Sequence, residues 1–243
     1  MTEELKKLVN EAYKLFSKYS ASVPLDVCTV CCVTKEEESE LVHNPLKKLP
    51  LNLLRKYHIS AKSTQPDLIE WKYFLPRFLE SISNNQFPGF DPESSLSRNE
   101  YYSKEDWESE EWSLIQNWGN EYFKFFLNTY PLPETDYIDS YILLFYKGRI
   151  DIQQLLNFWA SNITKCSILH FSDLINFGYD NYELKILASP YSDEIISDII
   201  YKWIISEEVK RRFSKGLLNV LQGIDLNKRK IIELECTYSI LQR

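Results

Sequence analysis

Residues 104–130, "KEDWESEEWSLIQNWGNEYFKFFLNTY", decide the fold class, because their apolar side chains recur at the spacing of a single helix face. One stripe contains Trp107, Leu114, Trp118 and Phe125, and a second set widens it, namely Trp112, Ile115, Tyr122 and Phe126. Four carboxylates lie outside the stripe, at Glu105, Asp106, Glu108 and Glu110. With Ser103 as a cap before it and Pro131 after it, the stretch predicts a long amphipathic helix.

Shorter segments of the same kind fill the rest of the chain. Only 6 of the 243 residues are Gly, too few for the frequent tight turns of a β-protein. Helices are predicted over 3–19, 34–42, 50–61 and 66–83, and in six segments between 137 and 242, with left-handed C-caps at Gly148, Gly178 and Gly223. The predicted fold class is all-α, a multi-helix globular domain, and the paired helices also suit an irregular, α-solenoid-like helical-repeat array.

Residues 85–102, "NQFPGFDPESSLSRNEYY", lack helical periodicity and are rich in Pro, Gly, Asn and Ser. They predict a loop between an N-terminal helical region, 1–84, which holds the cysteine cluster, and a C-terminal helical region, 103–243. We expect the second region to pack on the first within one continuous domain.

Charge and apolar content narrow the classes of partner. The chain has 35 acidic and 28 basic residues, and its net charge of −7 disfavours nucleic acid and favours a basic or neutral partner. No apolar run approaches the roughly 20 residues needed to span a bilayer, and the start "MTEELKKLVNEAYKLF" has no apolar core of a signal peptide. Five cysteines are an odd number, which indicates reduced thiols. The sequence therefore predicts a cytoplasmic protein without a membrane partner.

Three segments in the first third of the chain resemble an uncharacterised family of bacterial proteins. They are "VCTVCC" (27–32), "NPLKKLPLNLLRKYHISA" (44–61) and "EWKYFLPRFLESIS" (70–83), which match a C-x-x-C turn, a "PL..L....L..Y" helix and a "YFLPR.LE" helix. The matching positions are Cys28, Cys31, Pro45, Leu46, Leu49, Leu54, Tyr57, Ala61, Tyr73, Phe74, Leu75, Pro76, Arg77, Leu79 and Glu80. The family has no assigned activity, so the resemblance implies a bacterial, intracellular, helical protein and transfers no catalytic residue. Cys32 lies outside the pattern.

The cysteine cluster has three interpretations at this point. Cys28 and Cys31 are spaced to hold one zinc ion, with His43 as the nearest candidate for a further ligand, although a second C-x-x-C pair is missing. The thiols could instead be reduced side chains that pack within the loop. A redox pair is the third interpretation, but the helix start inside a βαβ unit that this motif requires is absent.

Two further features carry weaker signals of function. Cys166 and His170 stand four residues apart on one helix face, as a nucleophile and a base could, yet they lie in an apolar run where a backbone carbonyl is expected to satisfy the histidine. Arg77 follows Pro76, and we expect it to donate to a carbonyl or to Glu80 as structural support. No known catalytic motif is present, which favours a non-enzymatic protein without excluding an enzyme.

The acidic start of the long helix is the predicted partner-binding surface. We expect its carboxylates to contact a basic partner and three aromatic residues to serve as anchors. The predicted surface consists of Glu105, Asp106, Glu108, Glu110, Tyr101, Tyr102 and Trp107. The alternative is that these residues form a solvated outer face. The leading hypothesis is a bacterial interaction protein without a cofactor, specifically an immunity or antitoxin protein that neutralises a basic toxin or effector domain. The alternatives are a metal- or thiol-dependent enzyme centred on Cys28, Cys31 and His43, and a helical scaffold that binds a peptide.

Overall fold

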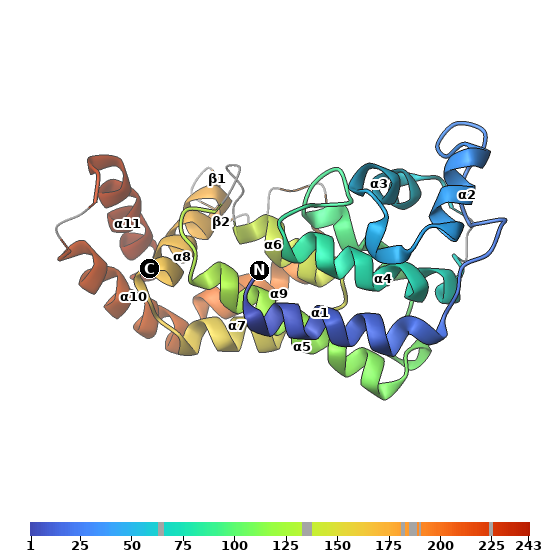
Figure 1. The fold of residues 1–243 in the computed structure, drawn as a ribbon. Helices are drawn as coiled ribbons and strands as arrows, with labels where there is room; N and C mark the ends of the chain where they lie inside the picture. The colour runs from blue at the N-terminus through green and yellow to red at the C-terminus, as the bar shows by residue number, and fades with distance from the viewer. Residues whose placement is uncertain (63–65, 133–137, 181–182, 185–188, 190, 224–225) are drawn as a thin grey trace. The chain divides into compact units, whose positions relative to one another are not determined.

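The structure is a computed structural model that describes all residues except 63–65, 133–137, 181–182, 185–188, 190 and 224–225. The predicted all-α fold class is confirmed (Figure 1). The α-helices are α1 (Glu3–Leu15), α2 (Lys35–His43), α3 (Leu51–Ile59), α4 (Leu68–Ser83), α5 (Ser109–Leu127), α6 (Ile138–Lys147), α7 (Ile152–Ser161), α8 (Lys165–Gly178), α9 (Glu194–Ile205), α10 (Glu207–Leu221) and α11 (Lys228–Leu241). Short 3-10 helices span Phe16–Lys18, Leu46–Lys48, Glu93–Tyr101 and Lys104–Asp106, and β1 (Tyr179–Asp180) pairs antiparallel with β2 (Glu183–Leu184).

The chain divides into two compact units. Unit 1 contains Met1–Tyr122 and Leu144–Ile150, and unit 2 contains Phe123–Leu143 and Asp151–Arg243. The limits of these units differ from those of the regions 1–84 and 103–243 predicted from the sequence. Residues 85–102, predicted as a loop, lie within unit 1 and include the 3-10 turns of Glu93–Tyr101. None of the helices that the structure describes combines the length and the apolar character needed to cross a bilayer.

The first helices begin at the capping residues that the sequence indicates. Thr2 accepts a hydrogen bond from the backbone N–H of Leu5 at the start of α1, and Asp67 caps α4. Thr34 and Glu37 form a reciprocal capping box at the start of α2. Each cap satisfies backbone donors that have no partner within the helix, which is why these polar residues fix the start points.

The long helix begins later than predicted. Ser103 caps the 3-10 turn Lys104–Asp106 rather than α5, because the Asp106 carboxylate accepts from the Ser103 backbone N–H and hydroxyl at 2.7 and 3.0 Å. Trp107 then adopts an extended backbone, and its side chain is buried edge-on against Phe16, with ring centroids 6.4 Å apart. The helix α5 starts only at Ser109. A 3-10 helix and an α-helix can both begin with a capping residue and an acidic first turn, so the sequence pattern alone does not distinguish the two.

Unit 1 is organised around α4. Helix α1 packs against it through Leu5, Val9 and Ala12, all buried. Pro76 lies inside α4, and Arg77 donates to the carbonyl oxygen of Leu49 at 3.0 and 3.1 Å and to Glu80 at 2.8 Å. The predicted contact of Arg77 with Glu80 is therefore confirmed. The carbonyl group that Arg77 binds belongs to Leu49, in a neighbouring segment.

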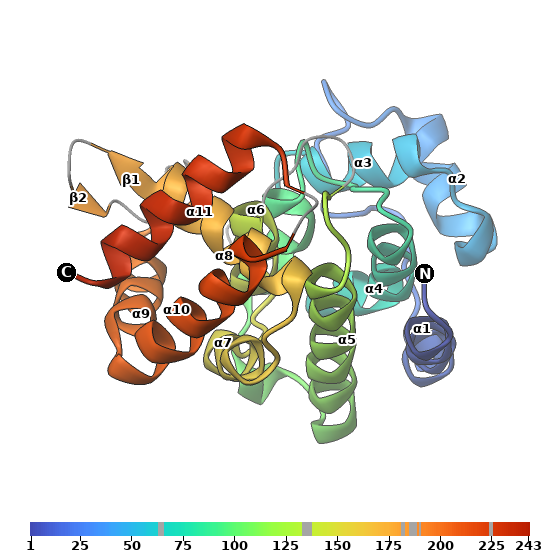
Figure 2. The ribbon, with the colours of Figure 1, turned by 90° about the vertical axis from the view of Figure 1, so that its left-hand side faces the viewer.

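Unit 2 has an aromatic core in which α8 contacts α10 and α11 (Figure 2). Phe171 and Phe213 stack with ring centroids 3.9 Å apart, and Trp159 and Trp203 lie 5.3 Å apart. A Cβ atom added at Gly216 would lie 2.4 Å from Cδ1 of Ile168, so glycine at this position allows α10 to approach α8.

The prediction of left-handed caps at Gly148, Gly178 and Gly223 was wrong, because no glycine among the described residues has a positive φ. Beside Gly148, the positive φ, 58°, falls on Arg149. Gly148 instead provides space, because a Cβ atom there would lie 2.9 Å from Cδ1 of Leu96. The spacing of a glycine after an apolar run cannot distinguish a conformational need from a steric one.

Candidate metal site in the cysteine loop

The cysteines lie in the loop of residues 25–33 between α1 and α2, and three buried acceptors hold its backbone. The N–H of Leu25 donates to Glu38 at 2.7 Å, and the N–H of Asp26 donates to Glu70 at 2.9 Å. The N–H of Cys28 donates to the hydroxyl of Ser60 at 2.7 Å. These acceptors come from α2, α4 and the end of α3 and are at most 5% exposed. The loop is therefore fixed in place before any ligand arrives.

A tight turn brings three sulfur atoms together. The N–H groups of Cys32 and Val33 both donate to the carbonyl oxygen of Cys28, at 3.2 and 3.1 Å. Cys31 Sγ lies 3.3 Å from Cys28 Sγ and 3.3 Å from Cys32 Sγ, and all three sulfurs are within 4.8 Å of one another. The Cys31 side chain is exposed and the other two are half-buried, so a solvated ion can reach the cluster.

The thiols of Cys28 and Cys31 differ in their tendency to ionise. The Cys31 thiol and the backbone N–H groups of Cys31 and Val30 hydrogen-bond to the Cys28 sulfur, and they lower the pKa of Cys28. The same contacts with Cys28 and Cys32 raise the pKa of Cys31 to about 12. Of this pair Cys28 is therefore the thiol that ionises first, and a cation that displaces the remaining protons of the cluster would gain two more thiolates.

The arrangement fits a thiophilic ion with little adjustment. Zinc–sulfur bonds of about 2.3 Å in tetrahedral geometry separate two sulfurs by about 3.8 Å. The observed separations of 3.3 Å would have to widen by about half an ångström, which rotation of the exposed Cys31 side chain, common to both contacts, can supply.

The predicted third ligand, His43, does not belong to this group. The structure brings Cys28 and Cys31 together, and Cys32 completes the set. His43 lies in the last turn of α2, where its Nδ1 is 2.8 Å from the Ser39 carbonyl oxygen and 3.2 Å from the Ser39 hydroxyl. The sequence-based prediction omitted Cys32 because this residue lies outside the C-x-x-C spacing. Its position next to Cys31 was the signal that could have included it among the candidate ligands.

The other two histidines have buried, structural environments. His58 Nε2 is 2.7 Å from the Ser94 carbonyl oxygen, and burial, with Arg98 nearby, lowers the His58 pKa to about 3. His170 Nε2 lies 3.1 and 2.8 Å from the carbonyl oxygens of Phe126 and Thr129, as expected of a histidine satisfied by the backbone. Burial also lowers the His170 pKa.

The predicted partner-binding residues do not share one helix but are spread over the end of one 3-10 helix, the 3-10 turn Lys104–Asp106, the segment that follows it and the first turn of α5. Glu105 and Glu110 are exposed, and Tyr101 is 53% exposed. Two members have partners of their own: Asp106 caps the turn at Ser103, and Glu108 pairs with Lys18. Tyr102 and Trp107 are each only 7% exposed and contribute to packing within unit 1.

Sequence reasoning missed the buried charges in the same region. Glu111 is fully buried and lies 2.8 Å from Lys72 and 3.1 Å from Lys18, and it accepts a hydrogen bond from the Tyr19 hydroxyl at 2.5 Å. Burial opposes its ionisation, but the hydrogen bonds from Lys72, Tyr19 and Lys18 prevail and lower the pKa of Glu111. A signal was present, because Glu111 falls between Trp107 and Leu114 at helical spacing, on the apolar stripe itself.

Comparison of the chain with models of known protein families, with curated protein sequences and with solved structures finds no match.

Proposed function

We propose that the protein binds a thiophilic metal ion, with zinc as the first candidate, through Cys28, Cys31 and Cys32. The observation that supports this proposal is the convergence of three sulfurs within 4.8 Å on a loop tied to buried acceptors. Thiolates prefer soft or borderline cations such as Zn²⁺ and Cu⁺. Three protein ligands leave a fourth tetrahedral position for water or for a ligand from a partner. Among the described residues no further His, Cys, Asp or Glu joins this group, so the proposal covers binding and no reaction.

Metal content and spectroscopic titration test the proposal. Reduced, purified protein should take up one equivalent of Zn²⁺ or Cd²⁺, and Cd²⁺ should produce a sulfur-to-metal charge-transfer band. Cys28→Ser, Cys31→Ser and Cys32→Ser should each weaken binding by more than the roughly 10–100-fold cost of losing an outer-shell partner. Cys236→Ser is the matched control, because Cys236 is exposed on α11 and outside the group.

The same titration distinguishes the three-cysteine ligand set from the set predicted from the sequence, which includes His43. Retention of full affinity in His43→Gln supports the three-cysteine set, whereas a loss equal to that of the cysteine variants would restore His43 as a ligand. Wild-type protein that takes up neither ion in reducing buffer would contradict metal binding altogether.

We also propose a second role, as a cytoplasmic bacterial interaction protein of the immunity or antitoxin kind that neutralises a basic partner. The net charge of −7 and the exposure of Glu105, Glu110 and Tyr101 support it. Because Asp106 and Glu108 already have partners within the chain, Glu105 and Glu110 would supply most of the attraction.

Charge reversal tests this second role. Basic nuclease domains of secreted bacterial toxins serve as probes, and their association with the wild-type protein should slow as salt increases. Glu105→Lys with Glu110→Lys should reduce the association rate roughly 10-fold. A control with the same change in net charge, Glu4→Lys with Glu207→Lys, replaces exposed residues elsewhere. Equal effects of the two double variants, or a panel in which no domain binds, would count against the proposal.

A further inference from the structure

Two adjoining cavities lie in unit 2 beside the start of α11. One has a volume of about 500 Å³ and is lined mainly by polar residues of α8 and α11. The other has a volume of about 380 Å³ and is lined by Lys165, Cys166, Leu169 and Leu226. Both are bounded by Tyr130, Asn227 and Lys230. Their sizes fall in the range of about 300–1,000 Å³ that is typical of small-molecule sites.

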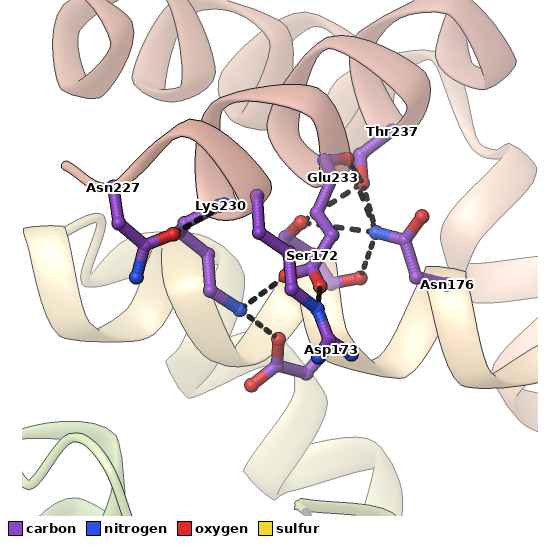
Figure 3. A network of polar contacts seen from close by, with 8 residues as sticks. Ser172, Asp173, Asn176, Asn227, Lys230, Glu233 and Thr237 are labelled. Atoms are coloured by element: carbon purple, nitrogen blue, oxygen red, sulfur yellow. Dashed lines mark hydrogen bonds and ion pairs between the residues drawn. The ribbon is translucent and has the colours of Figure 1, made fainter.

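Both carboxylates of the polar cavity, Asp173 and Glu233, are paired with cations. The Lys230 ammonium lies 2.7 Å from Asp173 and 2.5 Å from Glu233 (Figure 3). The Tyr130 hydroxyl is its third partner. Although burial opposes the charge, these hydrogen bonds raise the pKa of Lys230. Arg229 Nε takes the second oxygen of Glu233 at 3.0 Å. The two carboxylates are therefore balanced by two cations from α11.

The donors of the two cavities are not all occupied. Asn227 uses its Oδ1 to accept from the Lys230 backbone N–H at 2.9 Å. Within the part of the chain that the structure describes, the Asn227 Nδ2 amide, the Arg229 Nη groups and the Lys165 ammonium, all on exposed side chains, have no hydrogen-bond partner from the protein and are open to a ligand. Three cations line the cavities against two carboxylates, a local excess of positive charge in a chain with a net charge of −7.

The second cavity has an apolar part to its lining. Leu169 is 5% exposed, and its side chain lines this cavity together with Leu226 and the ring of Tyr130. A ligand that spans both cavities would place an apolar group here and its acceptor atoms beside Asn227, Arg229 and Lys165. From these cavities and their unengaged donors, we infer that unit 2 binds a small amphipathic anion, an organic carboxylate or phosphate ester with a short apolar chain.

Octanoate and octyl phosphate are the probes, and they distinguish a carboxylate from a phosphate source. Titration calorimetry with the full chain should show binding of at least one of them, roughly 10-fold or more tighter than 1-octanol, which has the chain without the charge. Cys166 reports the location, because it lines the apolar cavity and should be protected from alkylation, whereas the exposed Cys236 should not be. Octanol that binds as tightly as both anions, or an anion that leaves Cys166 unprotected, would overturn the inference.

Two substitutions test the recognition without removing the helix start. Asn227→Asp keeps a cap oxygen but replaces the amide donor with a carboxylate, and Arg229→Ala removes an exposed guanidinium. We expect each to weaken binding of the better probe roughly 10-fold. Lys228→Ala, in the same turn but outside both cavity linings, is the control. If Asn227→Asp and Arg229→Ala bind the probe as well as Lys228→Ala does, the inference fails.

Discussion

Each unit holds a lysine that pairs with buried or half-buried carboxylates, one in unit 1 and two in unit 2, but the two lysines have different surroundings. In unit 1 the Lys72 side chain is 6% exposed and lies beside fully buried Glu111. In unit 2 the Lys230 side chain is 18% exposed, between Asp173 and Glu233, and it borders a cavity. A charge pair sealed from water has to be satisfied entirely by the protein, whereas one that borders a cavity can exchange partners with solvent or a ligand. The comparison indicates that burial, rather than pairing, separates a structural charge cluster from one suited to binding.

Removal of the buried lysine should have the largest effect. Lys72→Met leaves the Glu111 carboxylate buried with fewer partners, and we expect a loss of about 3–5 kcal/mol in the free energy of unfolding. Urea denaturation followed by circular dichroism measures it. The double variant Lys72→Met, Glu111→Leu should recover much of the loss, because it removes both charges. A double variant that loses the sum of the single effects would show that the two residues are not coupled.

The second-largest effect is expected in the pH dependence of the free energy of unfolding, which reports on the burial of His58 in unit 1. Folded His58 stays neutral down to its pKa of about 3, whereas the unfolded chain takes up a proton below about 6.5. Between these values the unfolded state binds more protons, so stability falls as the pH is lowered, by up to about 1.4 kcal/mol per pH unit.

The histidine variants assign this slope. His58→Gln keeps a donor for the Ser94 carbonyl and should flatten the dependence of unfolding free energy on pH between 6.5 and 4. His43→Gln, at an exposed position, should leave the slope as it is in the wild type. Equal slopes for all three proteins would mean that His58 is not held neutral.

The smallest effect is expected for the lysine beside the cavity. Lys230→Met should cost about 1 kcal/mol, because water can reach Asp173 and Glu233 once the ammonium is gone. The wild-type contribution should also shrink in high salt, unlike that of Lys72. Urea denaturation at low and high salt checks both points. A loss as large as that of Lys72→Met would remove the distinction between the two networks.

Local signals in the sequence predicted the helices well. Thr2, Thr34 and Asp67 fixed helix starts because a cap needs only a neighbouring backbone N–H. The start of α5 was misplaced because Ser103 and Asp106 closed a separate turn, a choice stabilised by the burial of Trp107. A local pattern of four residues does not specify tertiary packing.

The candidate site was predicted only in part for the same reason. Cys28 and Cys31 follow from spacing alone, whereas the inclusion of Cys32 and the exclusion of His43 depend on how the turn closes and where α2 points. The cavities of unit 2 join Tyr130, α8 and the start of α11 across long stretches of chain, so no local motif could indicate them.

The anchoring of the cysteine loop has a consequence for how its chemistry can vary. Glu38, Glu70 and Ser60 bind backbone N–H groups of the loop, and these hydrogen bonds do not involve the cysteine side chains. Substitution at Cys28, Cys31 or Cys32 therefore leaves these three tethers in place. The loop is a frame on which ligand sets can be exchanged, from thiols to imidazoles or carboxylates, which makes it a natural place to design a site with a different metal preference.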